Sequence, residues 1–260
     1  RGTLMADIWR ATRGVPGFHA AARVHLIEAS PTLRGLQRDR LEGLPVSWHD
    51  TAETLPDAPL WLVANEFFDA LPIRQFQRDG AHWRERVVGL RDGALVLGLS
   101  DPAPRPELAH RLADTTTGDI VETCPASVPV MAAIQTRIAA RGGAALIIDY
   151  GGWRSLGDTF QALRGHASAP PLAHPGEADL TAHVDFEALA RAAPGLTHSA
   201  LTPQGTLLKR LGIDARAAKL AQNLHGAALE THQSAHHRLT DAAEMGTLFK
   251  ALALVAPGAP

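Results

Sequence analysis

The segment "LVANEFFDALP", residues 62–72, decides the fold class of this chain. An apolar run stops abruptly at Asn65 and Glu66, and two phenylalanines, Asp69 and a proline follow. A short apolar run that ends in polar residues is typical of a buried strand whose carboxyl end meets a ligand. The alternative is a loop that only caps the strand. The rest of the sequence bears on this choice.

Strand and helix patterns alternate around this segment. We expect strands at residues 22–30, 45–50, 59–66 and 142–152, the last being "GGAALIIDYGG". We expect helices at residues 3–13, 30–41, 126–141 and near 184–193, with further strands near 196–201 and 248–255. Ser30 and Pro31 are typical of a helix N-cap and first helical position. The alternation predicts an α/β fold, a parallel sheet with helices on both faces.

The pattern changes after the proline. Residues 73–99 alternate apolar and polar and contain Arg-Asp-Gly twice, at 78–80 and 91–93. Asp-Gly between alternating segments is a strong hairpin signal. We therefore predict one domain over residues 1–260, with an inserted β-hairpin lobe at 73–122. A polar loop at 152–183 is expected to lie over the active site.

Composition limits the function classes. The 260 residues carry a formal charge of −2, which provides no basic face for nucleic acid. No apolar run approaches the roughly 20 residues that span a bilayer, so no membrane insertion is expected. The single cysteine, Cys124, excludes an internal disulfide, and no Cys/His cluster has metal-ligand spacing.

Four predicted strands end in a carboxylate. The acids are Glu28, Asp50, Glu66 and Asp149. Ligands of open α/β sheets bind beyond the carboxyl ends of the strands, so these residues predict a shared binding edge. The alternative is a chance assembly of strand-end caps.

Two of these acids fit a nucleoside ligand. Glu28 follows "HLI" and precedes a helix start, so it could accept hydrogen bonds from ribose hydroxyls. A solvated strand end is the alternative for Glu28. Asp50 could contact adenine or simply begin a turn. Gly2 and Thr3, directly before a helix, fit the end of a glycine-rich loop that approaches a cofactor closely.

The order of several motifs resembles the MidA family of S-adenosylmethionine-dependent methyltransferases. The matching segments are "RGTLMADIWRA", "HLIEASPTLRGLQ", "NEFFDALPIRQF", "GGAALIIDYG", "GDTFQALRGH", "HPGEADLTAHVDF" and "MGTLFKALA". The similarity extends over nearly the whole chain, and "NEFFDALP" and "HPGEADLTAHVDF" are its most specific parts.

The resemblance implies a Rossmann-like class I methyltransferase sheet, mostly parallel and seven-stranded. In the family a glycine-rich motif, E-L-G-P-G-x-G-T, follows the first strand, and Gly2-Thr3 corresponds to its end. The first strand and an N-terminal region are therefore expected to be absent from this chain. The cofactor-binding residues are then Gly2, Thr3, Glu28, Ser30, His49, Asp50 and Asn65. The catalytic residues are Glu66, Asp69 and Asp149.

The resemblance also implies the activity. Mitochondrial members are protein-arginine methyltransferases that serve respiratory complex I assembly, so we expect S-adenosyl-L-methionine as cofactor and a protein substrate. That substrate would be a respiratory complex subunit, and the location the bacterial cytoplasm or the mitochondrial matrix. A non-catalytic assembly factor with the same fold is the alternative, and an NAD-dependent oxidoreductase is disfavoured by the motifs.

Overall fold

The computed structural model describes residues 1–259. The chain divides into two compact units, the first Arg1–Ala58 and the second beginning at Pro59. The first unit contains a parallel pair of strands, β1 (Val24–Ile27) and β2 (Val46–His49). Its helices are α1 (Thr3–Ala11), α2 (Phe18–Ala21) and α3 (Pro31–Arg40), with the 3-10 turns η1 (Thr12–Gly14) and η2 (Ala52–Thr54). The predicted N-cap of α3 is confirmed, because Ser30 accepts a hydrogen bond from Leu33 N.

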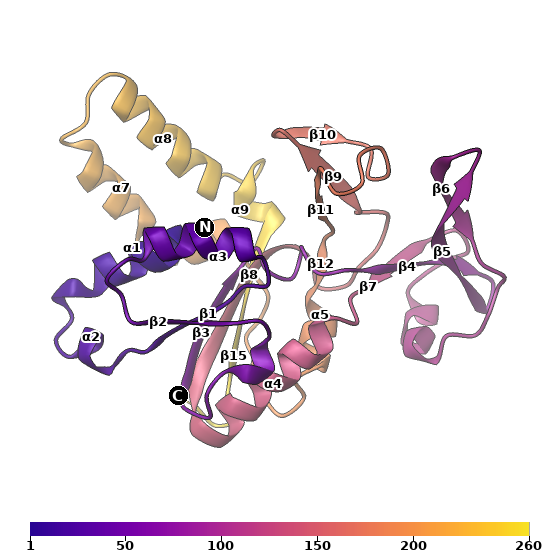
Figure 1. Ribbon diagram of the computed structural model, residues 1–260, viewed down its shortest axis with the longest axis horizontal. Coiled ribbons are helices and arrows are strands. Elements are labelled where there is room, and N and C mark those ends of the chain that lie inside the picture. The colour runs from indigo at the N-terminus through magenta and orange to yellow at the C-terminus, as the bar shows by residue number, and fades with distance from the viewer. Residues whose placement is uncertain (260) are drawn as a thin grey trace. The chain divides into compact units, whose positions relative to one another are not determined.

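The second unit is built on a six-stranded mixed sheet (Figure 1). Its long strands are β3 (Leu60–Asn65), β8 (Gly143–Gly152) and β15 (Phe249–Val255). β3 runs parallel to β8, and β15 runs antiparallel to it. The short strands are β12 (Val184–Asp185), β13 (Thr197–His198) and β14 (Thr202–Pro203). The predicted α/β class is confirmed. The described residues place six strands in this sheet.

Two glycines near the ends of β8, Gly143 and Gly151, permit its two parallel neighbours to approach. A Cβ on Gly143 would lie 2.0 Å from the carbonyl oxygen of Leu60 in β3. A Cβ on Gly151 would lie 2.2 Å from the carbonyl oxygen of Val184 in β12. Both glycines have positive φ, 114° and 154°. Only glycine fits these positions without moving the backbone.

The main core lies between this sheet and two helices, α4 (Ser127–Arg141) and α5 (Phe186–Arg191), which pack together (Figure 1). Ile134 and Ile138 of α4 pack with Ile147 of β8 and Leu252 of β15, and all four are at most 1% exposed. This packing matches the helical spacing read at residues 126–141.

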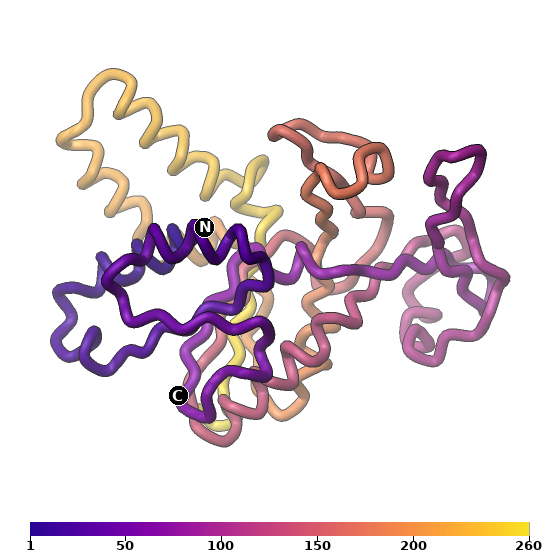
Figure 2. The backbone as a smooth tube through the Cα atoms, in the orientation of Figure 1, coloured from indigo at the N-terminus to yellow at the C-terminus, as the bar shows by residue number. Residues whose placement is uncertain are grey.

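The insertion is a four-stranded antiparallel sheet in the order β6-β5-β4-β7. Its strands are β4 (Arg74–Asp79), β5 (His82–Arg91), β6 (Ala94–Leu99) and β7 (Ile120–Thr123). The 3-10 helix η3 (Pro106–Ala113) lies between β6 and β7 in the chain. Both predicted hairpins are present, since Asp79 pairs with His82 and Arg91 pairs with Ala94. Phe76 and Trp83 form a separate small core. Figure 2 shows the chain leaving the central sheet through β4 and returning through β7.

The prediction of a loop without strands at 152–183 was wrong in detail. The segment folds into a three-stranded antiparallel sheet of β9 (Gln161–Arg164), β10 (Ala167–Ala169) and β11 (Asp179–Thr181). Gly165 and His166 connect β9 to β10 with φ of 57° and 65°. Two consecutive positive φ values define a tight hairpin turn, and "GH" is not among the dipeptides that announce one.

Four helices follow β14: α6 (Gln204–Arg210), α7 (Ile213–Ala221), α8 (Ala227–Thr240) and α9 (Met245–Leu248). The strand expected at 248–255 is β15. The strand expected at 196–201 is reduced to the two residues of β13, because both β13 and β14 pair only briefly with β15. Within residues 1–259 no helix is long and apolar enough to cross a bilayer.

Candidate functional site

The ends of β3 and β8 bring two predicted site segments together. The strands are parallel neighbours with Asn65 in register with Ile148, so Glu66 and Asp149 follow at the same edge of the sheet. The backbone N–H of Glu66 donates to the carbonyl of Ile148 over 3.0 Å. "NEFFDALP" is therefore a strand end and a turn at the carboxyl edge, where ligands of α/β sheets bind.

Asp149 holds this turn in place from inside the protein. Its Oδ2 accepts three consecutive backbone N–H groups, those of Phe67, Phe68 and Asp69, over 3.2, 3.1 and 3.3 Å. Its Oδ1 accepts the N–H of Tyr150 over 3.0 Å. The residue is 0% exposed. In this structure the Asp149 carboxylate therefore orders the turn and is covered by it.

Glu66 has an unusual backbone conformation at the start of the turn. Its φ is 50°, in the left-handed region that residues other than glycine seldom adopt. Its side chain is exposed and accepts a 3.3 Å hydrogen bond from the Asn65 amide. The bonds that Asp149 makes to the next three residues stabilise this conformation. An exposed carboxylate is thus presented beside a rigid turn.

Asp69 lies on the buried side of the same turn and is 5% exposed. The Tyr150 hydroxyl donates a hydrogen bond to its Oδ2 over 2.6 Å. Its Oδ1 is buried, and no donor among residues 1–259 meets it in hydrogen-bond geometry. Buried carboxylate oxygens are normally paired, so this oxygen is a candidate contact for a ligand donor. The carbonyl of Asp69 accepts from Ala182 N over 3.1 Å, which ties the turn to the segment before β12.

The two buried carboxylates influence each other's ionisation. Burial raises the pKa of Asp69, although the Tyr150 hydrogen bond acts in the opposite direction. Burial and the negative charge of Asp69 raise the pKa of Asp149 to about 7. Burial, followed by the hydrogen bond to Asp69, raises the pKa of the Tyr150 hydroxyl, so this group stays a proton donor at neutral pH. The pair therefore titrates as a unit, and a cation beside it would favour the doubly ionised form.

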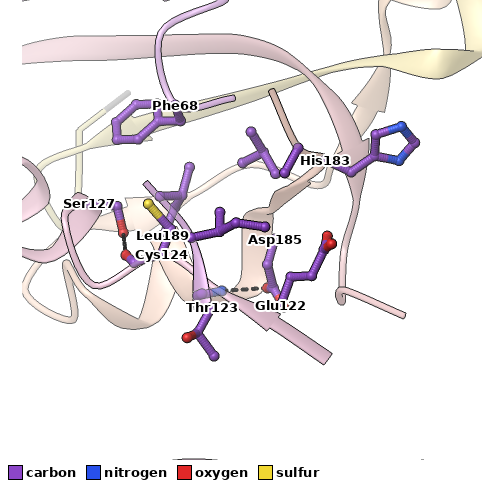
Figure 3. A pocket seen from close by; sticks show the side chains of 12 residues that line it. Phe68, Glu122, Thr123, Cys124, Ser127, His183, Asp185 and Leu189 are labelled. Carbon is purple, nitrogen blue, oxygen red and sulfur yellow. Dashed lines mark hydrogen bonds between the residues drawn. The ribbon is translucent and has the colours of Figure 1, made fainter. Parts of the chain in front are cut away.

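A small pocket lies behind the turn (Figure 3). Phe68, Cys124, Ser127 and Leu189 contribute to its wall, and the Ser127 hydroxyl donates to the Cys124 carbonyl over 2.7 Å. Burial raises the pKa of the Cys124 thiol, which is therefore a weak nucleophile. The pocket has a mainly structural character, and the buried ring of Phe68 anchors the turn beside it.

In the first unit, Glu28 is held by its neighbours. Its Oε1 accepts from Ser30 N over 2.9 Å, and its Oε2 accepts from the Gln37 amide over 3.1 Å. Each carboxylate oxygen has further lone pairs, so a diol could still donate to Glu28. Ser30 uses its hydroxyl as the α3 cap. The structure therefore orients Glu28 at the end of β1, where the sequence predicted it.

The other predicted residues of the first unit have local partners. Asp50 forms a 2.6 Å ion pair with Arg34. His49 Nε2 lies 2.9 Å from His25 Nδ1, and its Nδ1 lies 2.9 Å from the Thr54 hydroxyl. Gly2 precedes α1 with φ 77°, and Thr3 is the first helical residue. The glycine thus adopts a conformation that a glycine-rich loop requires.

Tyr150 and Gln37 are not among the site residues predicted from the sequence. The signal for Tyr150 was its position directly after the strand-end acid in "IIDYG". Its partner Asp69 is 81 positions away, a contact that only the parallel pairing of β3 and β8 explains. Among residues 1–259 no cluster of His, Cys, Asp and Glu has the composition of a metal site.

Comparison with known proteins identifies the class to which this fold and this strand edge belong. A family model described as "Putative S-adenosyl-L-methionine-dependent methyltransferase" matches residues 1–204. The chain belongs to this family, which confirms the predicted resemblance. Similar curated proteins are the mitochondrial protein arginine methyltransferases NDUFAF7 of Xenopus tropicalis, 32% identical over 98% of the chain, and of Danio rerio, 36% identical over 83%.

This chain spans 66% and 57% of the length of those two relatives, respectively. A solved structure from Burkholderia thailandensis is also similar, with a TM-score of 0.81 and 31% identity over 98% of this chain and 68% of that one. It is described as a COG1565 superfamily member and likely methyl transferase bound to S-adenosyl-homocysteine. A second structure from the same organism has a TM-score of 0.74, with 30% identity over 90% of this chain and 66% of the other.

Proposed function

We propose that this protein is an S-adenosylmethionine-dependent methyltransferase that transfers a methyl group to an arginine side chain of a protein. The turn at residues 66–69 carries the proposal. It presents one exposed carboxylate, Glu66, and one buried carboxylate with an unpartnered oxygen, Asp69. A guanidinium is bound best by carboxylates that accept its forked N–H donors. The names of the similar NDUFAF7 proteins support the same substrate class.

We assign cofactor-binding residues in each unit from their positions at strand ends and at the start of α1. Glu28 at the end of β1 would accept the ribose hydroxyls, with Ser30 and His49 beside it and Asp50 toward the base. Gly2 and Thr3 would approach the cofactor through their backbone. In the second unit, Asn65 at the end of β3 is the predicted cofactor residue. The solved relative bound to S-adenosyl-homocysteine supports this cofactor. When bound, S-adenosylmethionine supplies a methyl group that is activated by the sulfonium charge.

The chain's own residues orient the acceptor and take its proton. An arginine side chain is protonated in water because its pKa exceeds about 12. Asp69 would fix the guanidinium through its free oxygen, and Glu66 would accept the proton released when the new C–N bond forms. Asp149, which is fully covered, contributes by holding both residues in place. The positioning of reactants and the exclusion of water are the main contributions a protein makes to such a displacement.

We further assign the insertion at 73–122 and the segment at 152–183 to the acceptor side. Two contacts support this. Ala182 N donates to the carbonyl of Asp69 over 3.1 Å, and Gln75 in β4 donates to Asp158 over 2.7 Å. The turn, the insertion and the 152–183 segment are thus connected by hydrogen bonds. A respiratory complex subunit is the protein partner that the family resemblance favours.

The experiment that tests this function uses the purified full-length protein and radiolabelled S-adenosylmethionine with extract from its own organism. Label should enter a protein, and acid hydrolysis should release methylated arginine. Glu66→Gln is the matched control and should lose the label. Label on another residue type would refute the arginine assignment. If calorimetry detects cofactor binding but no label enters any protein, the result would instead support a non-catalytic assembly factor.

A further inference from the structure

Asp149 holds the turn through backbone N–H groups, whereas Tyr150 bonds the side chain of Asp69. The Tyr150 ring packs against Phe249 and His183, with centroids 5.3 and 5.5 Å away in edge-on geometry. This packing points the hydroxyl at Asp69 Oδ2, 2.6 Å away. A shorter side chain in this place would not reach the carboxylate. The Tyr150 hydroxyl therefore occupies Oδ2 of Asp69 and leaves Oδ1 for another donor.

In the described part of the chain, no Lys, Arg or His forms an ion pair with Asp69. Asp149 is a second carboxylate, bound to the N–H of Asp69. Lys250 is in register with Asp149 on β15, but its ammonium group donates to the carbonyls of Thr247 and Leu248. His183 is kept mainly neutral by burial, which lowers its pKa despite the opposing charge of Glu122. Glu66 adds a further negative charge at the surface of the turn.

We propose that Tyr150 is a positioning residue whose hydroxyl occupies one oxygen of Asp69 and reserves the other, Oδ1, for a cationic N–H donor such as a guanidinium. The inference rests on the proposed function, because it describes how that function selects arginine. A neutral amide could donate to Oδ1, but it would not balance the negative charges of Asp69 and Asp149. A guanidinium supplies both a donor and the missing charge. The Tyr150 bond also favours ionised Asp69, because hydrogen bonds to a carboxylate stabilise its charged form.

The sequence offers a direct probe of this contact, since Tyr150 is the single tyrosine among the 260 residues. Labelling tyrosine with ¹³C at Cζ gives a signal that Tyr150→Phe identifies by its loss. As the pH rises, this signal should move when Asp69 ionises, since the phenol itself stays protonated. Asp69→Asn should abolish that movement. Phe249→Leu, which alters packing and leaves the hydrogen bond, should retain it.

Two titrations then test whether the site prefers a charged ligand. Both are carried out in the presence of S-adenosyl-homocysteine, the product form of the cofactor. Acetyl-arginine amide should change the chemical shift of the Tyr150 Cζ signal until binding saturates. The uncharged analogue acetyl-citrulline amide should leave the shift unchanged. Equal displacement by both probes, or none by the arginine probe, would overturn the proposal. No methyl transfer is needed for these measurements, so their outcome is independent of whether the protein proves to be an active enzyme.

A separate measurement tests the effect on Asp69 itself. With ¹³Cγ-labelled aspartate, the resonance lost in Asp69→Asn identifies the residue. Its titration midpoint should lie at higher pH in Tyr150→Phe than in the wild type, because the variant keeps the ring and loses only the hydroxyl. An unchanged midpoint would refute the positioning role. If Tyr150→Phe does not fold, the Cζ titrations of the wild type and Asp69→Asn still decide the question.

Discussion

The side-chain amide of Gln37 donates a 3.1 Å hydrogen bond to the carboxylate of Glu28. Trp48 Nε1 donates in turn to Gln37 Oε1 over 2.8 Å, which fixes the orientation of the amide. Gln37 is 7% exposed, so its amide is largely shielded from competing water. The Glu28 carboxylate is therefore held in one orientation before any ligand arrives, and preorganised acceptors bind at lower entropic cost.

Replacing Glu28 by alanine in the full-length protein should weaken S-adenosylmethionine binding by about 1.5–3 kcal/mol, the scale of hydrogen bonds to a charged group. Isothermal calorimetry measures the change. Glu42→Ala removes an exposed carboxylate of the same unit and should leave the dissociation constant unchanged. If Glu28→Ala also binds like the wild type, Glu28 does not contact the ribose.

Gln75 joins the insertion to the rest of the second unit. Its amide nitrogen donates to Glu122 and to Asp158, both over 2.7 Å, and the residue is 6% exposed. Gln75→Ala should lower the free energy of unfolding by about 1–3 kcal/mol, because two carboxylates lose a shared donor. Urea denaturation measures this. Gln77→Ala, two residues along the same strand, removes only a 3.4 Å bond to Gly118 and should cost less than about 0.5 kcal/mol.

Much of the second unit could be predicted from local sequence patterns. The glycines of "GGAALIIDYGG" marked both ends of β8, and the structure shows that a side chain at Gly143 or Gly151 would meet a neighbouring strand. The two Asp-Gly turns predicted the hairpins of the insertion, because turn residues act within a few positions of themselves. These features depend on short-range constraints.

The contacts that complete the candidate site depend on long-range pairing. Tyr150 meets Asp69, and Asp149 meets Phe67, across about 80 positions of sequence. The sequence placed Asp149 at a strand end and Asp69 three residues after Glu66, but it contained no sign that Asp149 would be fully covered and would anchor the turn. Burial of this kind follows from which strands pair, and no local pattern specifies that pairing.

The Asp69–Asp149 pair should give stability an unusual pH dependence. Both pKa values are raised in the folded state, that of Asp149 to about 7, so the folded protein binds protons more tightly than the unfolded chain. The free energy of unfolding contributed by the pair is therefore highest below about pH 4, the ordinary aspartate range, and falls as the pH rises toward 7.

Asp69→Asn should flatten this decline, because Asp149 then no longer has a charged neighbour. The measurement is the difference in unfolding free energy between wild type and variant at pH 5 and pH 8, from urea denaturation. The free energy of unfolding of the wild type, relative to that of Asp69→Asn, should be higher at pH 5 than at pH 8. Asp39→Asn, at an exposed position of α3, should keep the wild-type dependence. Parallel curves for wild type and Asp69→Asn would show that the two carboxylates are uncoupled.

Glu66 provides the test of chemistry at the turn. Its left-handed φ of 50° and exposed carboxylate place a proton acceptor at the edge of the sheet, beside the buried Asp69. Glu66→Gln preserves the shape and the bond from Asn65 but removes the charge. We expect cofactor affinity to stay within a few-fold and single-turnover methyl transfer to a cognate protein to fall by about 10²-fold or more, the range for loss of a general base.

The control for this test is Glu66→Asp, which keeps the carboxylate but shortens its reach, and which should retain more activity than Glu66→Gln. If the charge were needed only for folding, Glu66→Gln would lose stability and cofactor affinity together with activity, and Glu66→Asp would keep all three. Methyl transfer at wild-type rates by both Glu66→Gln and Asp69→Asn would mean that these carboxylates only shape the turn. The acceptor would then have to bind elsewhere on the second unit, and the exposed acids Glu177 and Asp179 would be the next residues to replace.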